Sequence, residues 1–323
     1  MLHSVLRDAA IPETFREELR TKFQTSARNS LALSAELVRL AALFKAQGVP
    51  FVALKGPMLS QYLYGALGMR TSSDIDVLVH REDVPGIRKI LVSSGYQLKT
   101  TLHWTSDSAC LGAREEEMSF ESPSGVSIDV HWRLMPRYSA SAFDNLSGWE
   151  SLRTVPLAGH EIQILAPEPL LLFLCAHGVK RMFERLRWIC DIARFLQLRL
   201  GAIQEQSRRA AALRQLSLGL HLARELLGVT VPEIQEDPEV ESLARTVSNR
   251  LLAGAVPPVP AAEPTRYTLR LLETRAQRRQ CLTGLYLTPS EAEYPRRPRV
   301  WRDVSRGKNK GSGHCPPSPR RSS

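Results

Sequence analysis

The residues with the clearest chemical potential form a short polar segment that leads into an apolar strand, Arg70-Thr71-Ser72-Ser73-Asp74-Ile75-Asp76-Val77-Leu78-Val79. Side chains of a strand alternate between its two faces, so Asp74 and Asp76 project in the same direction. Two carboxylates this close repel each other unless a cation lies between them. Mg²⁺ takes oxygen ligands, often one or two carboxylates together with substrate phosphates. The pair therefore predicts a divalent-metal site for nucleotide chemistry.

Two other segments carry residues that could join this site. The apolar run Phe51-Val52-Ala53-Leu54 reads as a buried strand, and the turn Lys55-Gly56-Pro57 after it opens a helix whose amino terminus suits phosphate. In the later strand Ser127-Ile128-Asp129-Val130-His131, Asp129 is the only acid. Three carboxylates on neighbouring strands can hold two metal ions, which activate the attacking oxygen and stabilise the leaving one in phosphoryl or nucleotidyl transfer.

At these positions the sequence resembles the uncharacterised nucleotidyltransferase family, which has a DNA-polymerase-β-like palm. It is also similar to the antitoxin-type and aminoglycoside-type nucleotidyltransferases. The resemblance extends over roughly residues 30 to 290. The matching motifs are Leu54-Lys55-Gly56-Pro57-x-Leu59, Tyr64-Gly65, Arg70-x-Ser72-x-Asp74-Ile75-Asp76-Val77-Leu78-Val79, Ile128-Asp129-Val130-His131-Trp132, and His177-Gly178-Val179-Lys180 followed by Glu184-Arg185-Leu186-Arg187-Trp188-Ile189-Cys190-Asp191-Ile192-Ala193.

The resemblance implies an α+β fold, with a mixed sheet and flanking helices in the palm and a helical domain after it. It implies a Mg²⁺-dependent enzyme, with two metal ions, that transfers NMP from an NTP to a small-molecule, peptide or protein acceptor. Asp74 and Asp76 would be metal ligands, and Asp129 would be the third carboxylate, as a metal ligand or as a base toward the acceptor hydroxyl. The residues that would contact the nucleotide are Lys55, Gly56, Arg70, Ser72 and Lys180.

The turn after the first strand departs from the wider superfamily. Its well-studied members have Gly-Ser or Gly-Gly there, so that a hydroxyl or a second amide helps to hold the triphosphate, whereas this chain has Gly56-Pro57. Proline has no N–H, so one phosphate-binding donor is missing, and Lys55 or Arg70 would have to substitute. The departure keeps a second function open, an antitoxin-like regulatory module that binds nucleotide with little or no turnover.

Several of these residues also have a structural interpretation. Arg70 could neutralise the aspartate pair as a structural ion pair, and Ser72 could shape the turn before the strand. His131 could be a core or supporting histidine, since that is the commoner role. Asp191 lies in an apolar stretch, and a buried carboxylate needs a partner, so we expect it to form an ion pair with an arginine. We expect an exposed helix face for Arg181 and Arg185.

The elements that must position these residues follow from hydrophobic periodicity and turn signals. We predict helices over 12–48, 58–64 and 83–93, strands over 51–54, 75–79 and 96–99, and hairpins over 118–132 and 155–165. After Pro167 the pattern is helical, over 170–181, 186–198, 203–213, 216–227 and 268–280. The predicted parts are an N-terminal helical segment (1–48), a palm domain (49–166), a helical domain (167–253), a Pro-rich linker with a C-terminal helix (254–295) and a basic disordered tail (296–323).

Charge and cysteine usage exclude other classes. Of the net charge of +10, residues 296–323 contribute +8 and the first 295 residues only +2, which argues against nucleic acid as a partner of the folded body and against an RNA nucleotidyltransferase. The five cysteines lack metal-binding spacing and suit a reducing cytosol. The sequence starts without a secretory signal, and its longest apolar run is too short for a membrane span. We therefore expect a cytoplasmic protein.

Overall fold

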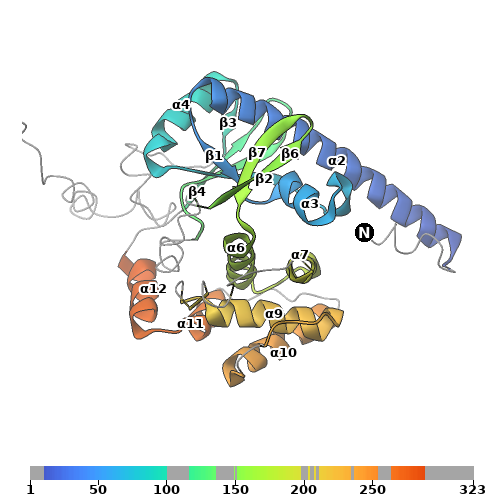
Figure 1. Ribbon diagram of the computed structural model, residues 1–323, viewed down its shortest axis with the longest axis vertical. Helices are drawn as coiled ribbons and strands as arrows, with labels where there is room; N and C mark the ends of the chain where they lie inside the picture. The colour runs from blue at the N-terminus through green and yellow to red at the C-terminus, as the bar shows by residue number, and fades with distance from the viewer. Residues whose placement is uncertain are drawn as a thin grey trace, which may run out of the picture.

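The computed structural model describes residues 11–99, 116–135, 149, 151–197, 203, 207–208, 211–233, 236–253 and 263–287. Within these residues, seven strands form one mixed sheet in the order β3-β4-β5-β2-β1-β7-β6 (Figure 1). The strands are β1 (Phe51–Ala53), β2 (Asp74–Val79), β3 (Gln97–Leu98), β4 (Glu117–Glu121), β5 (Ser127–His131), β6 (Leu152–Leu157) and β7 (His160–Leu165).

Strand β2 lies in the interior of this sheet. It pairs antiparallel with β1 and parallel with β5, and β1 pairs parallel with β7 on its other side. Every residue of β2 after Asp74 is buried. A strand covered on both faces is expected to be apolar throughout, so the carboxylates of Asp74 and Asp76 require a specific reason.

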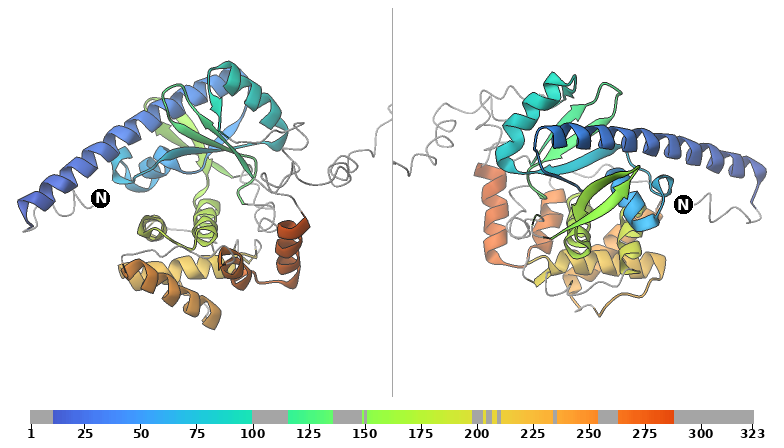
Figure 2. Two further views of the ribbon diagram at one scale, coloured as in Figure 1. Left: turned by 180° about the vertical axis from the view of Figure 1, so that it is seen from behind. Right: turned by 45° about the horizontal axis from the view of Figure 1, so that its top comes forward.

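Helices flank the sheet. Helix α2 (Glu13–Ala46) runs across one face with α4 (Val84–Ser93) beside it, as both views of Figure 2 show. The buried apolar side chains of α2 recur at helical spacing, and they are Leu33, Leu37, Leu40 and Phe44. Helix α3 (Gly56–Tyr64) begins just after β1. Two short 3₁₀ helices, η1 (Leu67–Met69) and η2 (Arg81–Asp83), precede and follow β2.

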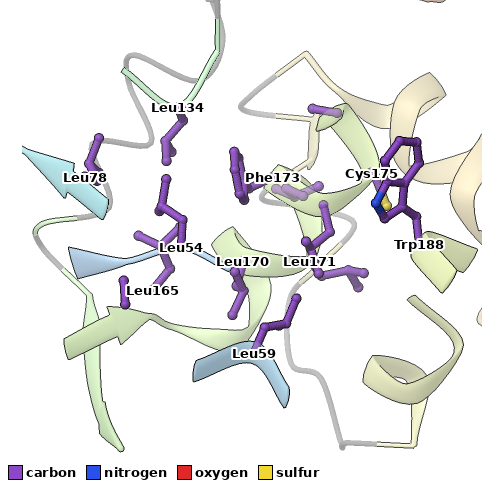
Figure 3. Close-up of a cluster of buried hydrophobic side chains, with 14 of the residues drawn as sticks. Leu54, Leu59, Leu78, Leu134, Leu165, Leu170, Leu171, Phe173, Cys175 and Trp188 are labelled. Atoms are coloured by element: carbon purple, nitrogen blue, oxygen red, sulfur yellow. The ribbon is translucent and has the colours of Figure 1, made fainter. Parts of the chain in front are cut away.

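Beyond β7 the chain is helical. The helices are α6 (Pro167–Lys180), α7 (Leu186–Leu196), α9 (Leu213–Leu227), α10 (Pro238–Leu252), α11 (Glu263–Leu271) and α12 (Arg275–Leu287). Figure 3 shows Leu170 and Phe173 of α6 beside Leu54 and Leu165, which follow β1 and end β7. One cluster of buried apolar side chains continues from the sheet into these helices, and the division of the chain into five parts stays a prediction.

The single helix predicted over 268–280 is wrong, because the structure has α11 and α12 with a break between them. The side-chain Oε1 of Gln277 accepts hydrogen bonds from the backbone N–H groups of Glu273 and Thr274, and the Oγ1 of Thr274 accepts one from the N–H of Gln277. This reciprocal capping starts a new helix at Thr274. Five of the eleven residues of the helix predicted over 203–213, residues 254–262 of the linker, and the tail lie outside the described residues.

None of the helices in the described ranges is both long and apolar enough to cross a membrane.

Candidate active site

A cleft of about 250 Å³ opens between the start of β2, strands β4 and β5, and helices α6 and α7. All eight residues that the sequence analysis named as catalytic or nucleotide-binding line this cleft. They are Lys55, Gly56, Arg70, Ser72, Asp74, Asp76, Asp129 and Lys180. Lining the same cleft does not assign a role to any of them, so each is described below by its contacts.

The pairing of β2 with β5 brings the three carboxylates together. Asp76 and Asp129 are register partners in this parallel pair, and Asp74 stands two residues before Asp76. Register partners project from the same face of a sheet, so the three side chains occupy adjacent positions on one face. Ser119 of β4, the register partner of Asp129, donates a hydrogen bond from Oγ to Oδ1 of Asp129 at 2.6 Å.

Asp76 is the most completely enclosed of the three, with 3% of its side chain exposed. Its Oδ1 lies 2.8 Å from Nζ of Lys55 and 3.1 Å from Nε2 of His131. Burial alone would raise the pKa of Asp76, but Lys55 and His131 outweigh it and hold that pKa well below its usual range. Its other oxygen, Oδ2, is buried and has no hydrogen-bond partner. Asp76 is therefore negatively charged, and only one of its two carboxylate oxygens has a polar partner.

The other two carboxylates differ from Asp76 in their electrostatics. Burial and then the charge of Asp76 raise the pKa of Asp74. Burial also raises the pKa of Asp129, to about 6; the hydrogen bond from Ser119 opposes this shift, while Asp76 and Glu117 add to it. A cation near these groups would favour their charged forms.

The donor set suits Mg²⁺ in type, because it offers carboxylate oxygens. The buried Oδ2 of Asp76 is an acceptor that a cation would satisfy. Among the described residues, no three His, Cys, Asp or Glu groups are close enough to hold one ion. Instead the ammonium of Lys55 neutralises Asp76. The residues thus fit Mg²⁺ in the chemistry of their donors, while Lys55 occupies one oxygen of Asp76.

Two acidic residues of the cleft were missed by sequence reasoning. Oε2 of Glu117 lies 3.1 Å from Nδ1 of His131, and burial, which lowers the pKa of His131, is outweighed by Glu117 and Asp76, which raise it. Glu116 is ion-paired with Lys180. The available signal was the acidic run 115–117 directly before an apolar strand, with Glu117 and Ser119 alternating on one face.

The wall that faces the carboxylates is basic. Between the end of α6 and the start of α7 it carries four cationic side chains and one acid, Glu184; the cationic residues are Lys180, Arg181, Arg185 and Arg187. The exposure predicted for Arg181 and Arg185 is confirmed, but neither lies on a helix face: both are in the turn between α6 and α7, and both line the cleft. Burial, followed by the nearby charges of Arg70 and Arg185, lowers the pKa of Arg187. Clustered cations of this kind suit an anionic ligand.

Arg70 is engaged by groups other than the aspartate pair. Its Nε donates to Oδ2 of Asp191 at 2.8 Å, and its NH1 donates to Oγ of Ser72 at 2.8 Å. The arginine partner expected for Asp191 is thus confirmed. The structural alternative for Arg70 needs correction, because its ion pair is with Asp191 rather than with Asp74 or Asp76. The reason is packing: α7 brings Asp191 against the segment that precedes β2.

Gly56 combines an unusual backbone conformation with a close contact to the site. Its φ is +67°, and a Cβ at this position would lie 3.1 Å from the backbone oxygen of Asp74. We expect Gly56→Ala to lose about 1–2 kcal/mol of stability from the left-handed conformation. In addition, the new methyl group should displace Asp74 and weaken the binding of Mn²⁺. Urea unfolding and Mn²⁺ titration measure the two effects.

Gly65 provides the matched control. Its φ is +70°, but nothing lies within 4 Å of a Cβ added there. Gly65→Ala should therefore show the same backbone cost with unchanged Mn²⁺ affinity. Equal Mn²⁺ affinities in the two variants would mean that the contact between Gly56 and Asp74 does not position the carboxylate.

Three solved structures are similar to the chain at low identity. A lincosamide antibiotic adenylyltransferase, bound to lincomycin, is 15% identical over 50% of this chain and 94% of that chain, with a TM-score of 0.35. An antigenic nucleotidyltransferase-like protein from Paracoccidioides brasiliensis is 16% identical over 68% and 94%, with a TM-score of 0.40. The antibiotic-resistance factor ANT(2'')-Ia is 12% identical over 69% and 95%, with a TM-score of 0.34.

No curated protein matches the sequence. The model of a protein family described as uncharacterised nucleotidyltransferase matches residues 1–228, which include all eight candidate residues of the cleft. That match extends over more than two thirds of the chain, from helix α2 through the sheet to α9. The chain therefore belongs to this nucleotidyltransferase family.

Proposed function

We propose that this protein is a Mg²⁺-dependent nucleotidyltransferase that transfers NMP from an NTP to a small-molecule, peptide or protein acceptor. The observation that supports this most is the arrangement of charge across one cleft. Asp74, Asp76 and Asp129 occupy adjacent positions on one face of the sheet, and a basic wall from α6 and α7 faces them. Metal ions on the acidic side and cations opposite would neutralise a triphosphate between them.

The carboxylates of Asp74 and Asp76 would hold the metal, with Asp129 as the third carboxylate. When bound, Mg²⁺ supplies positive charge that stabilises the phosphate oxygens and the departing pyrophosphate. Asp129 is only partly buried and faces the cleft, so it is placed either to join the metal ligands or to accept the proton of an acceptor hydroxyl.

The remaining groups bind and orient the nucleotide in this proposal. Once a metal ion neutralises Asp76, the ammonium of Lys55 is free to contact phosphate. Gly56 lines the cleft at the amino-terminal end of α3, where the helix dipole favours an anion, although Pro57 has no N–H to donate. Lys180 and the neighbouring arginines contribute positive charge from the opposite wall.

The experiment that tests this function is titration of the wild-type chain with each of the four common NTPs by calorimetry, with Mg²⁺, with Mn²⁺ and with EDTA. We expect binding that needs the metal. Pyrophosphate release is then measured with candidate hydroxyl-bearing acceptors and with the protein alone. Absence of nucleotide binding with either metal would refute the proposal.

Two observations favour the regulatory module as the second candidate. Pro57 removes one donor from the turn that faces the cleft, and Lys55 already neutralises Asp76. A module of this kind would bind NTP with Mg²⁺ in the same calorimetric titration. It would release no pyrophosphate with any acceptor supplied, whereas the enzyme would.

A further inference from the structure

The segment from Arg70 to Ser73 precedes the carboxylate strand and belongs to neither a helix nor a strand. Its backbone is nevertheless hydrogen-bonded by side chains from helices α2 and α3. Nδ2 of Asn29, on α2, donates to the carbonyl oxygen of Ser72 at 2.5 Å. The backbone N–H of Arg70 donates to Oγ of Ser60, on α3, at 3.2 Å. The segment is thus fixed at both ends.

Helix α7 binds the same segment through two side chains. NH1 of Arg187 donates to the carbonyl oxygen of Thr71 at 2.9 Å. Asp191, one helical turn further along α7, accepts the hydrogen bond from Nε of Arg70 on its Oδ2. Its Oδ1 accepts a hydrogen bond from the hydroxyl of Tyr64 at 2.9 Å. Both oxygens of Asp191 are therefore engaged.

The ion pair between Arg70 and Asp191 is enclosed, with 5% and 1% of the two side chains exposed. A buried ion pair is weak evidence for stability, because apolar side chains of similar volume often serve as well. The ion pair instead fixes the orientation of the Arg70 guanidinium. The guanidinium of Arg70 also donates to Oγ of Ser72, two residues before Asp74. Arg70 therefore connects Asp191 to the start of β2 by hydrogen bonds.

From these contacts we infer that Asp191 and Arg187 of helix α7 are positioning residues for the metal-binding carboxylates, and that they act through Arg70 and the segment 70–73. The inference rests on the proposed function. In this inference Arg70 connects α7 to β2, and its guanidinium hydrogen-bonds to Asp191 and Ser72 rather than to phosphate. Metal affinity becomes dependent on how α7 packs against the sheet.

The expected size of the effect follows from other metal sites, where loss of a group that orients a ligand costs about 10–100-fold in metal affinity. We expect Asp191→Asn to weaken Mn²⁺ binding by about this factor. Binding of Mn²⁺ alone, without nucleotide, is measured by electron paramagnetic resonance. This readout excludes any direct contact of Arg187 or Arg70 with phosphate.

Arg70→Lys separates positioning from a simple change of local charge. Lysine keeps the positive charge but cannot bridge Asp191 and Ser72 with a planar fork. A positioning role predicts weaker Mn²⁺ binding for this variant as well. If only the electrostatic field of the pair mattered, Arg70→Lys would bind Mn²⁺ as the wild type does, and the inference would be overturned.

The chain offers a matched control in the ion pair between Arg214 and Asp237, 2.7 Å apart, which joins α9 to the start of α10. Neither residue lines the cleft. Arg214→Lys should reduce stability, as Arg70→Lys does, and leave Mn²⁺ affinity unchanged. Thermal unfolding of each variant shows which substitutions leave the protein folded at the temperature of the titration.

If Asp191→Asn does not fold, the inference is tested with Arg187→Gln. Arg187 is only partly buried, so this variant is expected to fold, and the substitution removes the hydrogen bond to Thr71. Weaker Mn²⁺ binding in the folded variants supports the inference. If the wild type binds metal and NTP and the folded variants bind Mn²⁺ equally well, the inference is overturned but the proposed function is not. A wild type that binds neither Mn²⁺ nor NTP overturns the proposed function together with the inference.

Discussion

Replacing Asp76 with asparagine is expected to reduce nucleotidyl transfer about 10³-fold or more, because metal ions supply several kcal/mol of charge stabilisation and each 1.36 kcal/mol is a factor of ten in rate. Asp76 lies at the centre of the site, with Lys55 and His131 on one oxygen and a buried, unpartnered second oxygen. The asparagine side chain has nearly the same shape as the aspartate but carries no negative charge. Pyrophosphate release under saturating NTP and Mg²⁺ measures the loss.

Stability has to be followed in the same variant. Asparagine leaves the ammonium of Lys55 next to a neutral group in a mostly enclosed position, and an uncompensated buried charge costs up to about 3–5 kcal/mol. Urea unfolding therefore accompanies the assay. If the catalytic rate of wild type proves too low to measure, loss of Mn²⁺ binding is the equivalent readout. A folded Asp76→Asn protein with wild-type Mn²⁺ affinity would contradict the assignment.

The strands and the first helices could be predicted because their signals are local. The alternation of Asp74 and Asp76 with buried apolar residues placed both carboxylates on one face, and β2 has that arrangement. Asp129 stood out as the only acid in its strand. That it is the register partner of Asp76 could not be predicted, because the register depends on how two strands far apart in sequence pair.

Contacts between helices and strands could not be predicted from the sequence. The apolar residues around Asp191 in the sequence showed that it needs an arginine partner, and several arginines lie within ten residues of it, among them Arg185, Arg187 and Arg194. The partner is instead Arg70, because α7 packs against α3 and the segment before β2. Glu117 was missed for the same reason, since only the pairing of β4 with β5 brings it to His131.

The second large effect is expected at Lys55. Its Nζ lies 2.8 Å from Oδ1 of Asp76 and 5.9 Å from the ring centre of Phe173, and 13% of the side chain is exposed. A metal ion must therefore replace an existing ion pair. Because a charge-assisted hydrogen bond contributes about 1.5–3 kcal/mol, Lys55→Met should strengthen the binding of Mn²⁺ alone about 10–100-fold. In the proposed function, the same change should weaken NTP binding, because it removes a phosphate contact.

Lys180 is the control for this prediction. It lines the same cleft but is paired with Glu116, so Lys180→Met also removes one positive charge from the cleft without freeing Asp76. We expect Mn²⁺ affinity to rise clearly in Lys55→Met and little in Lys180→Met. Equal increases would mean that general field strength, rather than competition for Asp76, controls metal binding. Opposite changes in Mn²⁺ and NTP affinity in Lys55→Met alone would show one ammonium exchanging a carboxylate for a phosphate as the metal ion enters.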